Sequence, residues 1–116
     1  MHEEIGGGIR AARLAEAKAL ILRGFDDPRL SAATAARRLG ISTRYLHMLF
    51  EGDGLSFLEF VTNERLRQAA RMLREPEFRH LRVIDVALDC GFGDVRSFNR
   101  AFRHRFGCNP SEARRP

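Results

Sequence analysis

One helical pattern occurs twice in the 116-residue chain, and this duplication restricts the fold more than any other feature of the sequence. Each copy has a short helical segment, a glycine, an apolar residue, a capping residue, a second helical segment that ends at a phenylalanine, and a glycine that stops it. The first copy runs from Ala35 to Phe57 and the second from Val86 to Pro110. Two short helices joined by a tight glycine turn predict a helix-turn-helix, and two copies would let one chain read two stretches of groove.

Apolar residues at helical spacing predict an all-α fold with about seven helices. In this fold, a long central helix joins two helix-turn-helix subdomains. Gly40 provides the positive φ of the first turn, and Ser31, Ser42, Ser56 and Asp94 are predicted to cap helices. No alternating apolar segment predicts a strand. The expected helices cover residues 9–25, 32–39, 43–51, 57–74, 83–88 and 95–106, with a closing turn at 111–115.

The same spacing predicts which side of each second helix faces the core. The inward positions are Leu46, Leu49 and Phe50 in the first copy, and Phe98, Ala101, Phe102 and Phe106 in the second. Tyr45 and the phenylalanines are expected in the core rather than as stacking platforms for bases.

Composition shifts divide the chain into four parts. Three consecutive glycines within residues 1–8 indicate a linker or an expression remnant. Residues 9–55 form the first helix-turn-helix subdomain, 56–75 the connecting helix and 76–116 the second subdomain.

Arg65 falls inside the apolar pattern of the connecting helix, so we expect it to bond an acid of the second copy rather than DNA.

The formal charge is +5, which suits a polyanionic partner, and residues 95–108 hold four arginines and one histidine but no acid.

Cys90 and Cys108 are too few for a disulfide framework and are expected to be small buried hydrophobes, and the histidines lack metal-ligand spacing. No metal, no cofactor and no enzyme chemistry are expected. No membrane segment or signal peptide is found, which predicts a cytoplasmic chain.

From about Leu30 to Arg114, the chain resembles the DNA-binding domain of the AraC/XylS family of bacterial transcription regulators. The residues that carry the resemblance in the second motif are Ile84-Asp85-Val86-Ala87, Cys90-Gly91-Phe92, Asp94, Ser97-Phe98, Arg100, Ala101-Phe102, Arg105, Phe106-Gly107 and Asn109-Pro110-Ser111. Arg65-Leu66, Ala69-Ala70 and Leu73 resemble the family's connecting helix. The resemblance implies two recognition helices that enter successive major grooves of double-stranded DNA.

Two groups of residues are candidates for contact with DNA. The base-reading candidates lie on the outward faces of the two recognition helices: Thr43, Arg44, His47 and Met48 in the first, and Val95, Arg96, Asn99 and Arg100 in the second. The phosphate candidates are Ser42, Ser97, Arg103, His104 and Arg105. We expect the second helix to contribute more affinity because it carries more positive charge.

The alternative function is a helical interaction module that docks on RNA polymerase or another protein. The resemblance also implies a separate N-terminal effector or dimerisation domain, which this chain has no room for. The sequence leaves open the operator, the target genes, activation or repression, the effector ligand and the oligomeric state.

Overall fold

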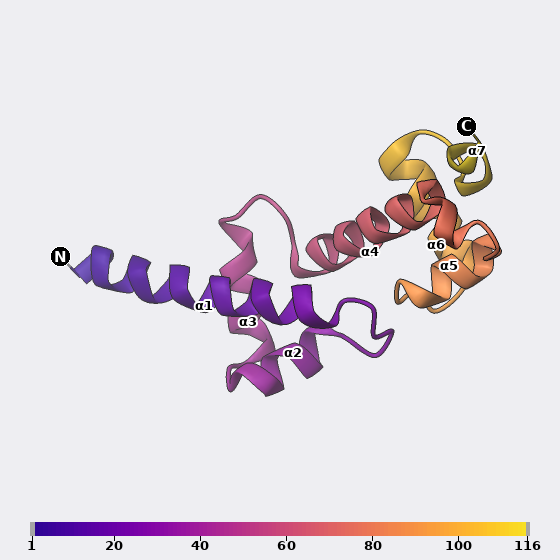
Figure 1. The fold of residues 1–116 in the computed structure, drawn as a ribbon. Helices are drawn as coiled ribbons and strands as arrows, with labels where there is room; N and C mark the ends of the chain where they lie inside the picture. The colour runs from indigo at the N-terminus through magenta and orange to yellow at the C-terminus, as the bar shows by residue number, and fades with distance from the viewer. Residues whose placement is uncertain (1, 116) are drawn as a thin grey trace. The chain divides into compact units, whose positions relative to one another are not determined.

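The computed structural model describes the backbone of residues 2–115 and the side chains of residues 8–115. Residues 2–115 form helices and no strands. The elements are α1 (His2–Gly24), α2 (Ala32–Leu39), α3 (Thr43–Glu51), α4 (Phe57–Arg74), the short 3-10 helix η1 (Pro76–Phe78), α5 (Val83–Asp89), α6 (Val95–Phe106) and α7 (Pro110–Arg114). The predicted all-α fold with seven α-helices is confirmed (Figure 1).

The chain forms two compact units. The first contains residues up to 24 together with 29–61, and the second contains 25–28 together with the residues from 62 onward. The division therefore falls inside α4, between Val61 and Thr62, and the loop after α1 belongs to the second unit. The three domain boundaries expected from the sequence, after residues 8, 55 and 75, stay predictions, because a division into compact units does not test them.

In the first unit, α2 and α3 pack against each other and against α1 (Figure 1). The buried side chains include Ile21 from α1, Ala35 and Ala36 from α2, and Leu46 and Phe50 from α3. The ring of Phe50 contacts the ring of Phe57 edge-on, with centroids 5.7 Å apart. The inward face predicted for α3 is confirmed, since Leu46, Leu49 and Phe50 are all buried.

The structure differs from the sequence expectation at the start of α1. The three glycines expected to lie in an unstructured segment are inside the helix, which is already formed at His2 instead of near Ile9. Glycine in a helix interior costs about 1 kcal/mol relative to alanine but does not prevent helix formation. Met1 lies outside the described residues.

The caps that define the first helix-turn-helix are formed as predicted. Ser31 caps α2, and its side-chain oxygen accepts a hydrogen bond from the Thr34 amide at 3.1 Å. Gly40 ends α2 with a left-handed φ of 69°. Ser42 then caps α3, its Oγ accepting from the Tyr45 amide at 3.0 Å. These local bonds fix where α3 begins, and hence which residues lie on its outward face.

In the second unit, α5 and α6 pack together and α7 packs on α6. The core is continuous with the buried side of α4 and consists of Leu66, Ala69, Ala70, Met72, Leu73, Val86, Ala87, Cys90, Phe92, Phe98 and Phe102. Cys90 is buried as predicted, whereas Cys108 is half-buried.

Phe106 does not belong to this core, which corrects the inward position expected for it. Its ring is 40% exposed, at the last turn of α6 before Gly107 ends the helix. The ring contacts Phe102, with centroids 4.6 Å apart, and Arg105 lies over it at 5.5 Å. Phe106 therefore covers the edge of the core, and a neighbouring cation shields part of its surface.

Arg65 has a structural role, but the predicted partner was wrong. Its Nε donates to the Phe25 carbonyl oxygen at 2.6 Å and its Nη2 to the Asp27 carbonyl oxygen at 3.0 Å. The charges of Asp27 and Asp26 partly offset the burial that lowers the pKa of Arg65. The arginine thus holds the loop after α1 inside the second unit, and the second copy supplies no acid to it.

No helix in the described part of the chain is long and apolar enough to cross a membrane.

Candidate nucleic-acid interface

The outward face of α3 carries the four candidates expected from the first copy. Thr43, Arg44, His47 and Met48 are all exposed, and Met48, the apolar member of this set, is 40% exposed. The cap at the start of α3, Ser42, is neutral, and the first turn contains no acid. The free amides and the helix dipole therefore leave this end of α3 positive, which suits a phosphate.

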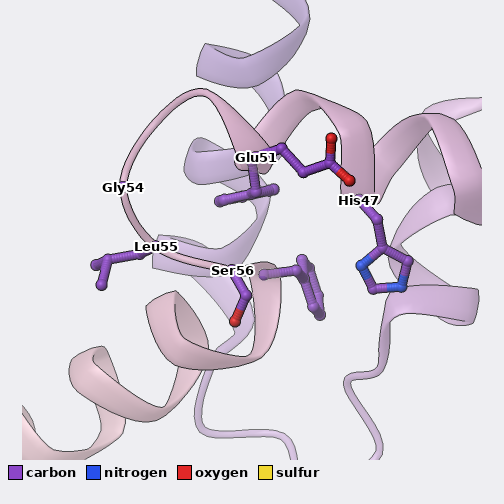
Figure 2. A pocket seen from close by; sticks show the side chains of 7 residues that line it. His47, Glu51, Gly54, Leu55 and Ser56 are labelled. Atoms are coloured by element: carbon purple, nitrogen blue, oxygen red, sulfur yellow. The ribbon is translucent and has the colours of Figure 1, made fainter.

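A hollow lies beside the C-terminal half of α3, between it and the start of α4 (Figure 2). His47 and Glu51 reach it from α3, and Gly54, Leu55 and Ser56 border it from the connecting loop. Because Glu51 lies one turn after His47, the far end of this face is negative. Positive charge on α3 is therefore concentrated in its first turn, at Arg44.

The outward face of α6 carries more positive charge. Arg96, Asn99 and Arg100 are exposed, while Val95 is half-buried. Arg96 and Arg100 are one helical turn apart and so lie on the same side of the helix. Neither guanidinium forms an ion pair with another described residue. Their donors are available to an external acceptor.

The start of α6 differs from that of α3. Asp94 caps it, and its Oδ1 accepts from the Ser97 amide at 2.7 Å while its Oδ2 accepts from the Ser97 hydroxyl at 3.0 Å. These bonds, and the nearby charge of Arg100, lower the pKa of Asp94. The Asp94 carboxylate thus already accepts hydrogen bonds from both the amide and the hydroxyl of Ser97. Ser42 is therefore better placed than Ser97 to serve a phosphate.

The C-terminal half of α6 is uniformly basic. Arg103, His104 and Arg105 are all exposed, in the last turn where cations complement the helix dipole. Arg105 also lies over the Phe106 ring. Arg103, His104 and Arg105 thus lie on the surface without a described acid paired to them, unlike Ser97.

Sequence reasoning missed a groove on this side of the molecule, formed where the segment before α7 faces α6. Arg100 and Arg103 line one side, and Asn109 and Ser111 line the other. The Asn109 side chain caps α7, its Oδ1 accepting from the Glu112 amide at 2.8 Å. The Asn-Pro-Ser sequence gave a signal for a cap, but only the packing of α7 on α6 brings these residues to the basic face.

In the described range, no group of three or more histidine, cysteine or acidic residues could hold a metal ion. Burial raises the pKa of the Cys90 thiol to about 12, so the thiol is neutral at physiological pH. The arginines on the outward faces of α3 and α6 carry hydrogen-bond donors suited to DNA phosphates and base edges.

Comparison with known proteins agrees with this interpretation. The sequence model of a family described as a helix-turn-helix domain matches residues 35–116. An uncharacterised helix-turn-helix transcriptional regulator, YijO of Escherichia coli, is 34% identical over 116 residues, covering 96% of this chain and 40% of its own length. The transcriptional activator RhrA of Rhizobium meliloti is 30% identical over 103 residues, covering 89% of this chain and 32% of its own length.

Solved structures show the same fold. The C-terminal domain of the response regulator AraT from Geobacillus stearothermophilus superposes with a TM-score of 0.81 at 25% identity, covering 88% of this chain and 83% of that one. The DNA-binding domain of the transcriptional factor AdpA, solved with a target DNA, gives 0.76 at 27% identity, covering 87% and 88%. The chain spans less than half the length of the curated relatives described above.

Proposed function

Because the chain belongs to the AraC/XylS family of helix-turn-helix DNA-binding domains, we propose that it regulates transcription by binding a specific sequence of double-stranded DNA. In this proposal α3 and α6 are the two recognition helices, and they enter successive major grooves. The observation that carries it is the exposed, acid-free face of α6, where Arg96 and Arg100 have no described ion-pair partner.

The base contacts of α6 come from Arg96, Asn99 and Arg100. A guanidinium can donate two hydrogen bonds to guanine, and an asparagine amide can pair with adenine. On α3, Arg44 reads a base in the first turn, with Thr43, His47 and Met48 around it. Val95 is half-buried, so it offers at most an apolar edge to a thymine methyl group.

The phosphate contacts fix the register of the domain on DNA. They come from Ser42 at the positive start of α3 and from Arg103, His104 and Arg105 near the end of α6. Ser97 contributes after its amide or its hydroxyl gives up its bond to Asp94. Such contacts supply affinity that falls with salt and carry no sequence preference.

Substitutions that separate these two kinds of contact test the proposal. Arg96→Ala and Arg100→Ala are expected to lose preference for particular bases, by about 1–3 kcal/mol at each position read. Arg103→Ala should weaken binding to all duplexes alike and reduce the salt slope by about one unit. Binding sites selected from random duplexes, followed by titration of single-base variants at several salt concentrations, provide the measurement.

Arg67→Ala is a matched control, because Arg67 is exposed on α4 and already paired with Glu64 at 3.5 Å. It should leave base preference unchanged. If the Arg96 and Arg100 double variant discriminated every operator position as well as the parent protein, these two residues would not be the base readers. If no duplex were bound at any salt concentration while RNA polymerase was bound tightly, the second candidate function would replace the first.

That second candidate is a protein-interaction module, and α5 provides one observation in its favour. Ile84 and Leu88 lie one turn apart on α5 and are 37% and 47% exposed. An apolar pair of this kind suits contact with a protein such as RNA polymerase. The two functions are compatible, since α5 is not one of the two recognition helices.

We also propose that this domain acts together with a separate N-terminal effector or dimerisation domain. Support comes from the lengths of the relatives, of which this chain covers 40% and 32% in the two described above. Ligand response and oligomeric state would then be properties of that other domain.

A further inference from the structure

A cavity of about 570 Å³ lies at one end of the second unit and shares no residue with the candidate nucleic-acid interface. It is formed where the end of α4 and the residue after η1 face the end of α7. Its lining consists of Leu73, Arg74, Glu75, Arg79, Ala113, Arg114 and Arg115. The volume is within the range of small-ligand sites, about 300–1,000 Å³.

Four of the seven lining residues are arginines, and only one is an acid. Arg74, Arg79 and Arg115 form no ion pair with a described residue. The single acid, Glu75, is already engaged, because both of its carboxylate oxygens accept from Arg71 Nη1 at 2.9 Å. This bond lowers the pKa of Glu75. The cavity therefore gathers positive charge that its own side chains do not neutralise.

Arg114 is held rigidly at the wall. Its Nη1 donates to the Leu81 carbonyl oxygen at 2.5 Å and its Nη2 to the Phe78 carbonyl oxygen at 3.3 Å. Its Nε is buried and has no hydrogen-bond partner among the described groups. The two bonds to carbonyl oxygens fix the guanidinium at the wall, where its positive charge adds to that of the other arginines.

The chemistry of the wall selects the kind of ligand. Guanidinium groups bind phosphate in planar, two-bond geometry more effectively than an ammonium does, and several of them offset its double charge. Leu73 and Ala113 supply an apolar part of the wall that an anion alone would leave uncovered. We propose that this cavity binds the phosphate group of a ligand, with room beside it for the organic part of a small phosphorylated molecule.

Inorganic pyrophosphate is the first probe, titrated into the protein by calorimetry in chloride buffer. The protein should bind it saturably at one site. Arg79→Gln combined with Arg115→Gln should weaken binding at least about tenfold, the loss expected from removing one charge-assisted bond or more. Both residues are exposed, so the fold should be retained, which circular dichroism checks.

The matched control is Arg37→Gln combined with Arg38→Gln, two exposed arginines at the end of α2 in the first unit. It removes the same net charge and should leave pyrophosphate affinity within about twofold, since long-range charge effects are screened by salt. Absence of saturable binding by the parent protein would overturn the proposal. So would a double variant of Arg79 and Arg115 that binds as tightly as the parent.

Duplex DNA distinguishes the two sources of phosphate. If the cavity takes a free phosphorylated molecule, the Arg79 and Arg115 double variant binds duplex DNA as the parent does, and pyrophosphate does not compete with DNA. If the cavity takes a DNA backbone phosphate, the double variant loses DNA affinity and pyrophosphate competes. If the parent protein bound no duplex DNA at all, the proposed function would be refuted. The pyrophosphate titration would still test the cavity.

Discussion

Gly40 and Gly91 occupy corresponding places in the two helix-turn-helix copies, but the structure makes very different demands on them. Both have positive φ, 69° at Gly40 and 102° at Gly91. A Cβ at Gly40 would meet open space, whereas one at Gly91 would lie 2.5 Å from the Phe25 carbonyl oxygen and 2.8 Å from Arg65 Nε. The first glycine provides only a backbone conformation, and the second also provides room for the loop that Arg65 holds.

Alanine at each glycine tests this difference. We expect Gly40→Ala to lower the free energy of unfolding by about 1–2 kcal/mol, the cost of a left-handed residue with a side chain. Gly91→Ala should cost about 2–5 kcal/mol, since overpacking against backbone adds about 1–3 kcal/mol. Urea unfolding of both variants measures the two costs. Equal losses would show that the loop moves away from residue 91 freely.

At the scale of elements, the two recognition helices have equivalent architecture, but a neutral residue caps one and a charged residue caps the other. The cap of α3 is the neutral Ser42, and the cap of α6 is the carboxylate of Asp94. Asp94 satisfies the first amides of α6 and stabilises its dipole, and in doing so it places a negative charge near Arg96 and Arg100. The positive charge of α6 is thus displaced along its face, away from the N-terminus.

The ionised Asp94 also gives the second unit a dependence on pH. Its folded pKa lies below the ordinary value of 3.8, so its charge stabilises the fold at neutral pH. That stabilisation is lost as the pH falls through the folded pKa. Asp94→Asn keeps a capping side chain without the charge. The parent protein should be more stable than this variant at pH 7, and the difference should shrink as the pH is lowered from 7 to 2 through the acid range.

Thermal unfolding of the two proteins across this range is the measurement. A stability difference that persists unchanged at pH 2 would show that the charge is not responsible. Asp85, whose pKa is also lowered, by its bonds to Arg82, titrates in the same range in both proteins and so cancels in the comparison.

At the scale of the whole molecule, each copy of the sequence repeat lies within one compact unit, but the units do not follow the order of the chain. The loop at residues 25–28, between α1 and α2, belongs with the second copy, where Arg65 holds it by two hydrogen bonds. The chain therefore passes between the units three times, after residues 24, 28 and 61. A substitution in this loop therefore alters contacts of the second unit, although the loop precedes the first helix-turn-helix in the sequence.

The proposed use of both copies predicts a two-part footprint on DNA. Two protected patches about 10 base pairs apart are expected, because recognition helices in successive major grooves are separated by one helical turn. Arg100→Ala should weaken both patches, since α6 provides most of the affinity. Arg44→Ala should expose mainly the patch under α3. Footprinting of the parent and both variants at one salt concentration makes the comparison, and a single patch for the parent would rule out simultaneous use of both helices.

Most helix boundaries and outward faces can be read from the sequence, because caps, glycine turns and apolar spacing are local. The start of α1, at His2 instead of near Ile9, is an exception. Ser31, Ser42 and Asp94 begin helices where the pattern placed them, and Arg44, Arg96 and Arg100 are exposed as expected. Features that depend on which distant segments meet emerge from the packing of the chain instead. These are the carbonyl partners of Arg65, the exposure of Phe106, the groove at Asn109 and the arginine cavity near α7. These features depend on contacts between different segments or on packing at the edge of the core. Local spacing of residues in the sequence encodes neither of these two causes.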